Sequence, residues 1–295
     1  MNRQEAENYV YQSYLKAAQF QDSQIKDEFK RKPQFSKNII EELSGTPCVV
    51  VTGSKGKGSV SCMIAQILQS EKKVGLMTSP HLVNFCERFK MNGKDMSDEE
   101  FIRHIELVKS PFDLVENEIT QQECISPMGI QAAVALSYFR EQQTEFNVFE
   151  CGKGAQYDDV NNIVHDYAVI NSIFLEHTRE LGMTLAEIAE NKSAVINGNQ
   201  KCVYVAEQNP EVLEIIRKRA AEKNVILKVY GEDFYAQNIR FANTGMIFDV
   251  IIGSNFFQEI SVPLLGEHQA RNAALALAIG LDILDFVNID AIKIK

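Results

Sequence analysis

The sequence has little positive charge for its length and no long apolar run. It carries 30 lysine and arginine residues against 40 aspartate and glutamate residues, so the 295-residue chain has a formal net charge of −10. Such a balance disfavours general binding to nucleic acid or to an anionic membrane surface, although a local basic pocket is compatible with it. No stretch approaches the roughly 18–20 apolar residues that a membrane-spanning helix needs. We therefore expect neither a nucleic-acid partner nor a membrane partner.

The six cysteines lack the spacing of a metal site. None forms a CxxC pair, and no cluster of cysteine and histidine has the spacing of zinc ligands. Most of the cysteines lie within apolar runs, which predicts free, reduced and buried thiols. The first residues, MNRQEAENYVYQSYLK, lack the apolar centre of a secretory signal. We expect a cytoplasmic protein, and a mitochondrial location stays open.

Apolar residues make up 45% of the chain, enough for a large core in one large domain or two smaller ones. Short apolar runs predict strands at residues 48–52, 74–77, 146–150, 168–173, 202–205 and 225–229. Helical spacing of apolar residues follows residue 59 and recurs at 98–108, 130–138 and about 269–284. Near-continuous apolar strands separated by helices predict an α/β fold with a mostly parallel sheet and flanking helices.

Two segments differ from this alternation. Residues 1–46 are polar and predict a helical N-terminal region that ends at Gly45-Thr46-Pro47. Residues 235–262 alternate between apolar and polar positions, and Asn243-Thr244-Gly245 and Gly253-Ser254-Asn255 interrupt them. This pattern predicts a small antiparallel meander.

A glycine-rich segment lies between the strand at 48–52 and the helix that follows it. It reads Gly53-Ser54-Lys55-Gly56-Lys57-Gly58-Ser59. Glycines allow backbone N–H groups to turn toward a phosphate, and the helix N-terminus adds partial positive charge. Lys57 can reach the β- and γ-phosphates, and the Ser59 hydroxyl can hold Mg²⁺. The segment predicts an ATP-binding phosphate loop.

The spacing of this loop departs from the usual Walker A pattern. That pattern has glycine five residues before Gly56, where Val51 stands, and serine or threonine directly after Lys57, where Gly58 stands. The departure disfavours an ordinary kinase or GTPase. The plain alternative is a glycine-rich turn between strand and helix that binds no ligand.

Several segments carry a resemblance to a known family. Residues 56–59 read GKGS and residues 78–82 read TSPHL, and these are followed by Glu87-Arg88, Asn92-Gly93 and SDEE at 97–100. They resemble the folylpolyglutamate synthase/dihydrofolate synthase branch of the Mur ligase superfamily, whose peptidoglycan ligases end the loop in GKTT. ECG at 150–152, EHT at 176–178 and GEHQARNAA at 266–274 extend the resemblance over about residues 47–284.

The resemblance implies an ATP-dependent carboxylate–amine ligase that forms ADP and phosphate. A folate-like carboxylate is activated as an acyl phosphate, and an amine, that of glutamate, then forms the amide. The implied organisation is a helical region at 1–46, an ATP-binding central domain at 47–284, and the start of a linker at 285–295 to a C-terminal domain that the sequence does not contain. Two alternatives stay open: a nucleotide-binding module that lacks catalysis or depends on a protein partner for that domain, and a Mur-type ligase for another acid.

The resemblance also assigns residues to the site. Lys57, His177 and Lys192 are the implied catalytic residues. The implied ATP-binding residues are Gly53, Ser54, Lys55, Gly56, Lys57, Gly58, Ser59, His268 and Asn272. The implied Mg²⁺ ligands are Ser59 at one site, and Ser79, Glu150 and His177 at or near a second. Lys192 is a further implied ligand, because the matching lysine of the family carries a carbamate that helps to hold metal. The implied substrate-binding residues are His81, Asp158 and Asn161.

Four of these positions have plainer alternatives. Glu150 could be a strand-end carboxylate that faces solvent, and His177 a loop or capping histidine. Lys192 ends a helix that Thr184 and Glu187 can open as a capping box, so it could be a solvated lysine that favours the helix dipole. His268 could be a helix-start histidine.

The match is weakest in the segment that the family uses near the acceptor. In residues 152–161, Gln156 and Val160 replace an arginine and a threonine of the family, whereas Asp158 and Asn161 are kept. Met128-Gly129 replaces the Phe-Glu that precedes a helix in the family. These changes leave the acceptor substrate open.

Overall fold

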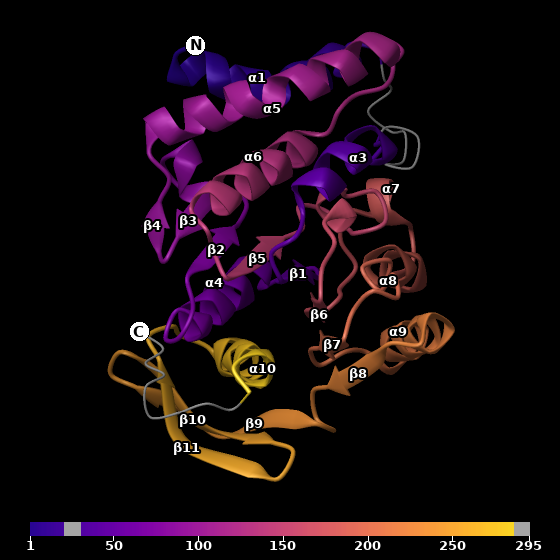
Figure 1. Ribbon diagram of the computed structural model, residues 1–295. Coiled ribbons are helices and arrows are strands. Elements are labelled where there is room, and N and C mark those ends of the chain that lie inside the picture. The colour runs from indigo at the N-terminus through magenta and orange to yellow at the C-terminus, as the bar shows by residue number, and fades with distance from the viewer. Residues whose placement is uncertain (21–30, 286–295) are drawn as a thin grey trace.

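The computed structural model describes residues 1–20 and 31–285, and Figure 1 shows their arrangement. The main sheet has the strand order β4-β3-β2-β5-β1-β6-β7-β8. Its strands are β1 (Cys48–Thr52), β2 (Val74–Met77), β3 (Phe89–Met91), β4 (Lys94–Asp95), β5 (Phe146–Glu150), β6 (Tyr167–Ile170), β7 (Cys202–Val205) and β8 (Ile226–Val229). All neighbours from β2 to β8 pair in parallel, whereas β3 and β4 form an antiparallel edge. The predicted α/β fold with a mostly parallel sheet is confirmed.

The central strands are buried along their whole length because both faces of the sheet are covered. Every residue of β1 and β5 is buried, as expected for parallel strands of near-continuous apolar sequence. In the register, Val51 pairs with Glu150, and Thr52 pairs with Ile170. The carboxyl ends of β5, β1 and β6 therefore lie side by side at one edge of the sheet.

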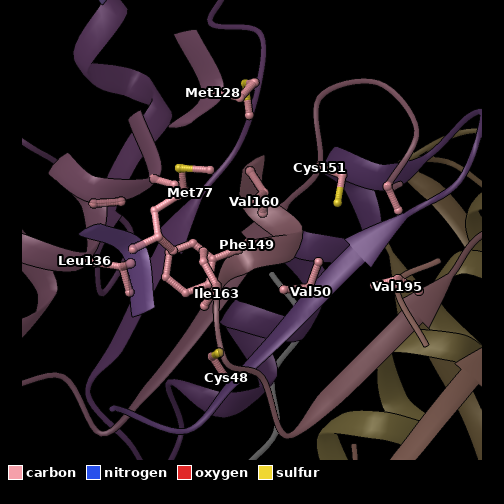
Figure 2. Packing of buried hydrophobic residues seen from close by; sticks show 14 of the residues in the cluster. Cys48, Val50, Met77, Met128, Leu136, Phe149, Cys151, Val160, Ile163 and Val195 are labelled. Carbon is pink, nitrogen blue, oxygen red and sulfur yellow. The ribbon is translucent and has the colours of Figure 1, made fainter. Parts of the chain in front are cut away.

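One face of the sheet packs against six helices from the N-terminal and middle parts of the described chain. These are α1 (Arg3–Ala18), α3 (Gln34–Leu43), α5 (Asp98–Glu118), α6 (Pro127–Glu141), α8 (Leu185–Ser193) and α9 (Pro210–Lys223). Val50, Met77 and Phe149 point into this core, together with Cys48 and Met128 (Figure 2). Burial of one such side chain contributes about 2 kcal/mol.

The other face packs against α4 (Lys57–Leu68) and α10 (Glu267–Ile283). Val49 and Val51 point into this second core, since successive residues of a strand face opposite sides. A small sheet with strand order β11-β10-β9 covers α10 from outside (Figure 1). Its strands are β9 (Phe234–Ala242), β10 (Gly245–Ile252) and β11 (Asn255–Val262), which confirms the predicted meander.

Some predicted boundaries were wrong. The helix predicted at 98–108 is α5, which continues through Pro111 to Glu118. The strand predicted at 168–173 is β6, which ends at Ile170. The predicted helical region at 1–46 contains α1 and α3, but its residues 21–30 lie outside the described residues, as does the predicted linker after residue 285.

The cysteines are free, as predicted, but one of them is not buried. Five are buried, whereas Cys62 is exposed. On α4, Val60, Ile64 and Ile67 face the core, and Cys62 lies off that stripe. No helix within the described residues is both long enough and apolar enough to cross a membrane.

Candidate functional site

The glycine-rich loop connects β1 to α4 at the carboxyl edge of the main sheet. Gly53 has φ +137°, and a Cβ there would lie 2.8 Å from Cβ of Asn171 and 2.9 Å from its carbonyl oxygen. Gly56 has φ +76° and precedes α4, and a Cβ there would lie 2.7 Å from Nδ2 of Asn171 and 3.0 Å from Nδ2 of Asn272. Both positions therefore require glycine.

Residues after β6 hold the loop in place. The Asn171 amide donates to the carbonyl of Lys55 at 2.9 Å and to Oδ1 of Asn272 at 3.2 Å. Oγ of Ser54 donates to the carbonyl of Phe174 and accepts from its N–H. Ser54 and Asn272 are both buried: Ser54 ties the loop to Phe174, and Asn272, in the first turns of α10, holds the Asn171 amide.

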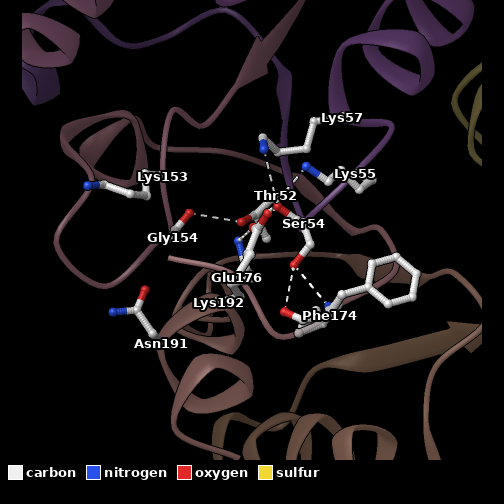
Figure 3. Close-up of polar contacts among 12 residues, drawn as sticks. Thr52, Ser54, Lys55, Lys57, Lys153, Gly154, Phe174, Glu176, Asn191 and Lys192 are labelled. Carbon is white, nitrogen blue, oxygen red and sulfur yellow. Dashed lines mark hydrogen bonds and ion pairs between the residues drawn. The ribbon is translucent and has the colours of Figure 1, made fainter. Parts of the chain in front are cut away.

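Two lysines converge on one carbonyl oxygen of the loop (Figure 3). Nζ of Lys57 donates to the Gly53 oxygen at 3.2 Å, and Nζ of Lys192 donates to the same oxygen at 2.8 Å. Glu176 lies 3.1 Å from Nζ of Lys192 and 3.9 Å from Nζ of Lys55. Burial and the Lys57 charge lower the pKa of Lys192, whereas Glu176 opposes this shift.

The alternative of a solvated helix-end lysine at Lys192 is wrong. The predicted capping box of α8 is present, with Thr184 and Glu187 as its members, but the Lys192 side chain is fully buried. Its side chain extends to Gly53, 139 residues earlier in the chain. Burial of an ammonium requires such partners.

We expect Lys192→Met to destabilise the protein by about 3 kcal/mol, because it leaves Glu176 without its buried partner. Denaturant unfolding measures this loss in the free energy of unfolding, and the m-value should be the same for both proteins. The double variant Lys192→Met/Glu176→Gln should recover part of it, since no unpaired charge is left. Equal stability of wild type and Lys192→Met would contradict the arrangement.

The Glu150 carboxylate lies beside the loop at the end of β5. Its side chain is buried, and Oε2 accepts the Ser79 N–H at 2.9 Å and lies 3.4 Å from an ideal Cβ on Gly58. Burial raises the pKa of Glu150 to about 7, against the Ser79 N–H and the Lys57 and Arg88 charges, which lower it. The alternative of a carboxylate that faces solvent is therefore wrong.

This arrangement fits a hard cation that is completed by phosphate. Mg²⁺ in nucleotide sites typically takes one or two carboxylates together with hydroxyl, water and phosphate oxygens. Glu150 is a buried carboxylate with a raised pKa, and the Ser59 and Ser79 residues carry hydroxyls on the adjoining segments. Within residues 1–20 and 31–285, no group of three or more His, Cys, Asp and Glu residues could hold a metal by itself. The structure does not gather His177 into such a group.

The three predicted histidines lie in separate places. His177 is exposed and precedes the short helix α7 (Thr178–Leu181), with φ +46°. His268 is exposed in the first turn of α10, beside Gly266. His81 is half-buried in the segment before the 3₁₀ helix η1 (Phe85–Arg88), where Nδ1 lies 2.9 Å from Nε of Arg88.

Asp158 and Asn161 bond to other protein groups. The Asp158 carboxylate is buried, accepts from the N–H groups of Lys153 and Val160, and lies 3.8 Å from the Arg31 guanidinium. Nδ2 of Asn161 donates to the carbonyl of Ala194. These bonds order the segment before and within η2 (Asp159–Asn162), and the predicted substrate contacts stay predictions.

A cavity of about 370 Å³ adjoins the phosphate loop. Its lining residues are Gly58, Ser59, Cys62, Met63, Gln66, Val262, Pro263 and Leu264. No local sequence pattern predicts this cavity, because the outer side of α4 and the connection from β11 to α10 meet only in the folded chain. The sequence assigned no role to Asn171, Glu176 or Arg88, whose partners include residues distant in sequence.

Comparison with known proteins gives consistent matches. The profile described as "Mur ligase middle domain" matches residues 51–280. The dihydrofolate synthase/folylpolyglutamate synthase of Bacillus subtilis is 31% identical over 229 residues, which cover 77% of this chain and 53% of that protein. A probable folylpolyglutamate synthase of Schizosaccharomyces pombe is 33% identical over 200 residues, which cover 64% of this chain and 39% of that protein. The chain thus spans about half the length, or less, of these curated relatives.

Solved structures share the fold. A mutant of Lacticaseibacillus casei folylpolyglutamate synthase aligns with a TM-score of 0.85 at 22% identity, over 99% of this chain and 70% of that one. A folylpolyglutamate synthase complex with AMPPCP and folate aligns with a TM-score of 0.83 at 23% identity, over 97% of this chain and 68% of that one. At this identity the likeness shows the fold alone.

Proposed function

The chain belongs to the Mur ligase family through its middle domain, and on this premise we propose that it is the ATP-using part of a ligase of the folylpolyglutamate synthase type. It would activate a folate-like carboxylate as an acyl phosphate and add glutamate. The observation that carries the proposal is the convergence of Lys57 and Lys192 on the Gly53 carbonyl, beside the buried Glu150. Such a group of charges suits a triphosphate and its counter-ion.

Each part of the loop has a task in this proposal. The N–H groups at the start of α4 and the Lys57 ammonium bind the β- and γ-phosphates. When Lys57 turns to phosphate, Lys192 still bonds the Gly53 oxygen and keeps the loop closed. Lys55, whose ammonium is exposed, adds positive charge at the rim.

The reaction needs no nucleophilic side chain. A carboxylate oxygen of the substrate forms a bond to the γ-phosphorus, and the bond to the β,γ-bridging oxygen breaks, which releases ADP. The amine of glutamate then forms a bond to the acyl carbon, the bond from that carbon to the phosphate oxygen breaks, and phosphate leaves with the proton lost from the amine nitrogen. Magnesium held by Ser59 at one site, and by Ser79 and Glu150 with His177 at or near a second, would offset the phosphate charge. A carbamate on Lys192 would add an anionic ligand there only in place of the ammonium that pairs with Glu176.

The substrates take separate places around the loop. We assign the adenosine to the cavity beside Ser59 and to the nearby start of α10, where His268 and Asn272 lie. The cavity is lined mainly by apolar groups, as is typical of a site for an aromatic base. We assign the acceptor substrate to the side of His81, with Asp158 and Asn161 in the adjoining segment.

The organisation belongs to the same proposal. Residues 47–284 form the ATP-binding domain, residues 1–46 a helical extension, and residues 285–295 the start of a linker. A separate protein could supply the part that the curated relatives have in addition. The cytoplasm is the compartment that the reduced cysteines favour.

Calorimetry and product analysis test the proposal together. AMPPCP with Mg²⁺ should bind the purified chain, and ATP should yield ADP and phosphate only when folate and glutamate are both present. Failure of AMPPCP to bind would overturn the proposal. Binding with amide formation only after a second protein is added identifies the partner-dependent form, and turnover with another carboxylic acid in place of folate identifies a different acceptor.

A further inference from the structure

A chain of directional hydrogen bonds joins His81 to helix α6 through Arg88. The Arg88 side chain is buried, and its Nε donates to Nδ1 of His81 at 2.9 Å. Nη1 of the same guanidinium donates to Oε1 of Gln131 at 2.8 Å, and Nε2 of Gln131 donates to the carbonyl of Pro127 at 2.9 Å. Each bond therefore fixes the orientation of the next group.

The first of these bonds determines where His81 carries its proton. A guanidinium has only donors, so Nδ1 of His81 must present its lone pair, and the neutral ring then carries hydrogen on Nε2. No other residue in the described part of the chain bonds Nε2 of His81. We propose that Arg88 is a positioning residue that fixes His81 as the Nε2–H tautomer, so that this N–H donates to an oxygen or nitrogen of the acceptor substrate.

The segment that carries His81 is held rigidly although part of it is exposed. The Glu87 carboxylate accepts from the N–H groups of Leu82, Val83 and Asn84 at 2.9, 3.2 and 2.8 Å. These bonds lower the pKa of Glu87 and keep it charged. The donor on His81 is thus oriented before the substrate arrives, which reduces the entropy lost on binding.

The surroundings indicate the kind of substrate group that meets this donor. The Leu82 and Val83 side chains are 93% and 89% exposed directly after His81. They offer an apolar surface beside one fixed N–H. A flat, weakly polar ring system with an acceptor atom at its edge matches this combination, and in this respect the inference rests on the proposed function.

Arginine is required because one side chain makes two directed bonds. The guanidinium reaches His81 and Gln131 at once and lies 4.8 Å from the centroid of the Phe85 ring. Lysine has no planar fork and cannot hold both partners in fixed directions. Arg88→Lys should therefore keep the charge and lose the orientation.

Nitrogen-15 NMR of the full chain with labelled histidine tests the tautomer without any turnover. Long-range ¹H–¹⁵N correlations should show His81 as the Nε2–H form, with the signal assigned by its absence in His81→Gln. In Arg88→Met and Arg88→Lys the two ring nitrogens should give the averaged signals of mixed tautomers. Gln131→Met frees Arg88 from α6 and removes no charge, and it should give the same change. It takes the place of the Arg88 variants if these fail to fold.

Binding measurements separate positioning from general stability. With AMPPCP present, the Kd for folate should rise about tenfold in Arg88→Met, the effect of one lost hydrogen bond, whereas the Kd for AMPPCP stays within twofold. The matched control is Arg103→Met, which removes an exposed arginine paired with Glu141 and should change neither value.

An Nδ1–H form in wild type, or an unchanged tautomer in all Arg88 variants, would overturn the positioning role. If AMPPCP binds but folate does not, the substrate contact is refuted, and the NMR result alone decides the tautomer. If AMPPCP does not bind either, the proposed function has failed separately.

Discussion

Replacing Lys57 with alanine should reduce phosphoryl transfer from ATP by about 10²–10³-fold, the usual effect of removing one donor to transition-state charge. The fold should change little, because the Gly53 oxygen that accepts from Lys57 also accepts from Lys192. ADP release in the presence of folate and glutamate measures the rate. Thermal unfolding of the same preparation should give a melting temperature within a few degrees of wild type.

Two other lysine variants separate the role of Lys57 from the general effect of losing one positive charge. Lys37→Ala removes an exposed lysine that pairs with Glu41 one turn later, and its rate should stay within twofold of wild type. Lys55→Ala removes the exposed ammonium at the rim of the loop, and its loss should be about tenfold or less. A Lys57→Ala rate equal to that of Lys37→Ala would refute the role of this loop in phosphoryl transfer.

The strands could be predicted where burial left a continuous apolar run. The boundaries of β1, β5 and β7 agree with the expected ones to the residue, since each crosses a core covered on both faces. The strands β3 and β4 were missed because they are only 3 and 2 residues long. The end of α5 was also missed, because Pro111 and the polar residues around it obscure the helical pattern.

The site could be predicted only in part, because its partners come from distant segments. The loop itself is contiguous and therefore visible in the sequence. The burial of Lys192 depends on Gly53 and Glu176, and the raised pKa of Glu150 depends on how closely α4 covers the end of β5. No local pattern encodes these contacts. From sequence, a lysine at the end of an amphipathic helix is predicted to be solvated. The fold instead buries the Lys192 side chain beside the phosphate loop.

Glu150 links the stability of the protein to its proposed ligand. In the unfolded chain the carboxyl titrates near 4.5, whereas in the folded protein its pKa is about 7. Between these two pH values the folded state binds more protons than the unfolded state. The stability that the protonated Glu150 carboxyl contributes is therefore fully present below pH 4.5 and is lost as the pH rises through 7. By pH 8 the loss is about 3 kcal/mol.

The variant Glu150→Gln should therefore have opposite effects on stability and on ligand binding. At pH 8 without metal or nucleotide it should exceed wild type by up to about 3 kcal/mol in the free energy of unfolding, and the difference should vanish near pH 4. Its affinity for AMPPCP with Mg²⁺ should fall about 100-fold, because the buried carboxylate that would offset the metal charge is gone. Denaturant unfolding across the pH range and calorimetry at pH 8 give the two quantities.

Glu99→Gln is the matched control, since Glu99 is exposed in the first turn of α5. It should change the free energy of unfolding by less than about 0.5 kcal/mol and leave AMPPCP binding unchanged. Loss of both stability and binding in Glu150→Gln would mean that the carboxylate supports the fold. In that case the Gln side chain does not replace the bond that Glu150 accepts from the Ser79 N–H. A gain in stability with unchanged binding would remove Glu150 from the metal site. Only a gain in stability with a loss of binding fits a carboxylate kept buried for a cation that arrives with the nucleotide.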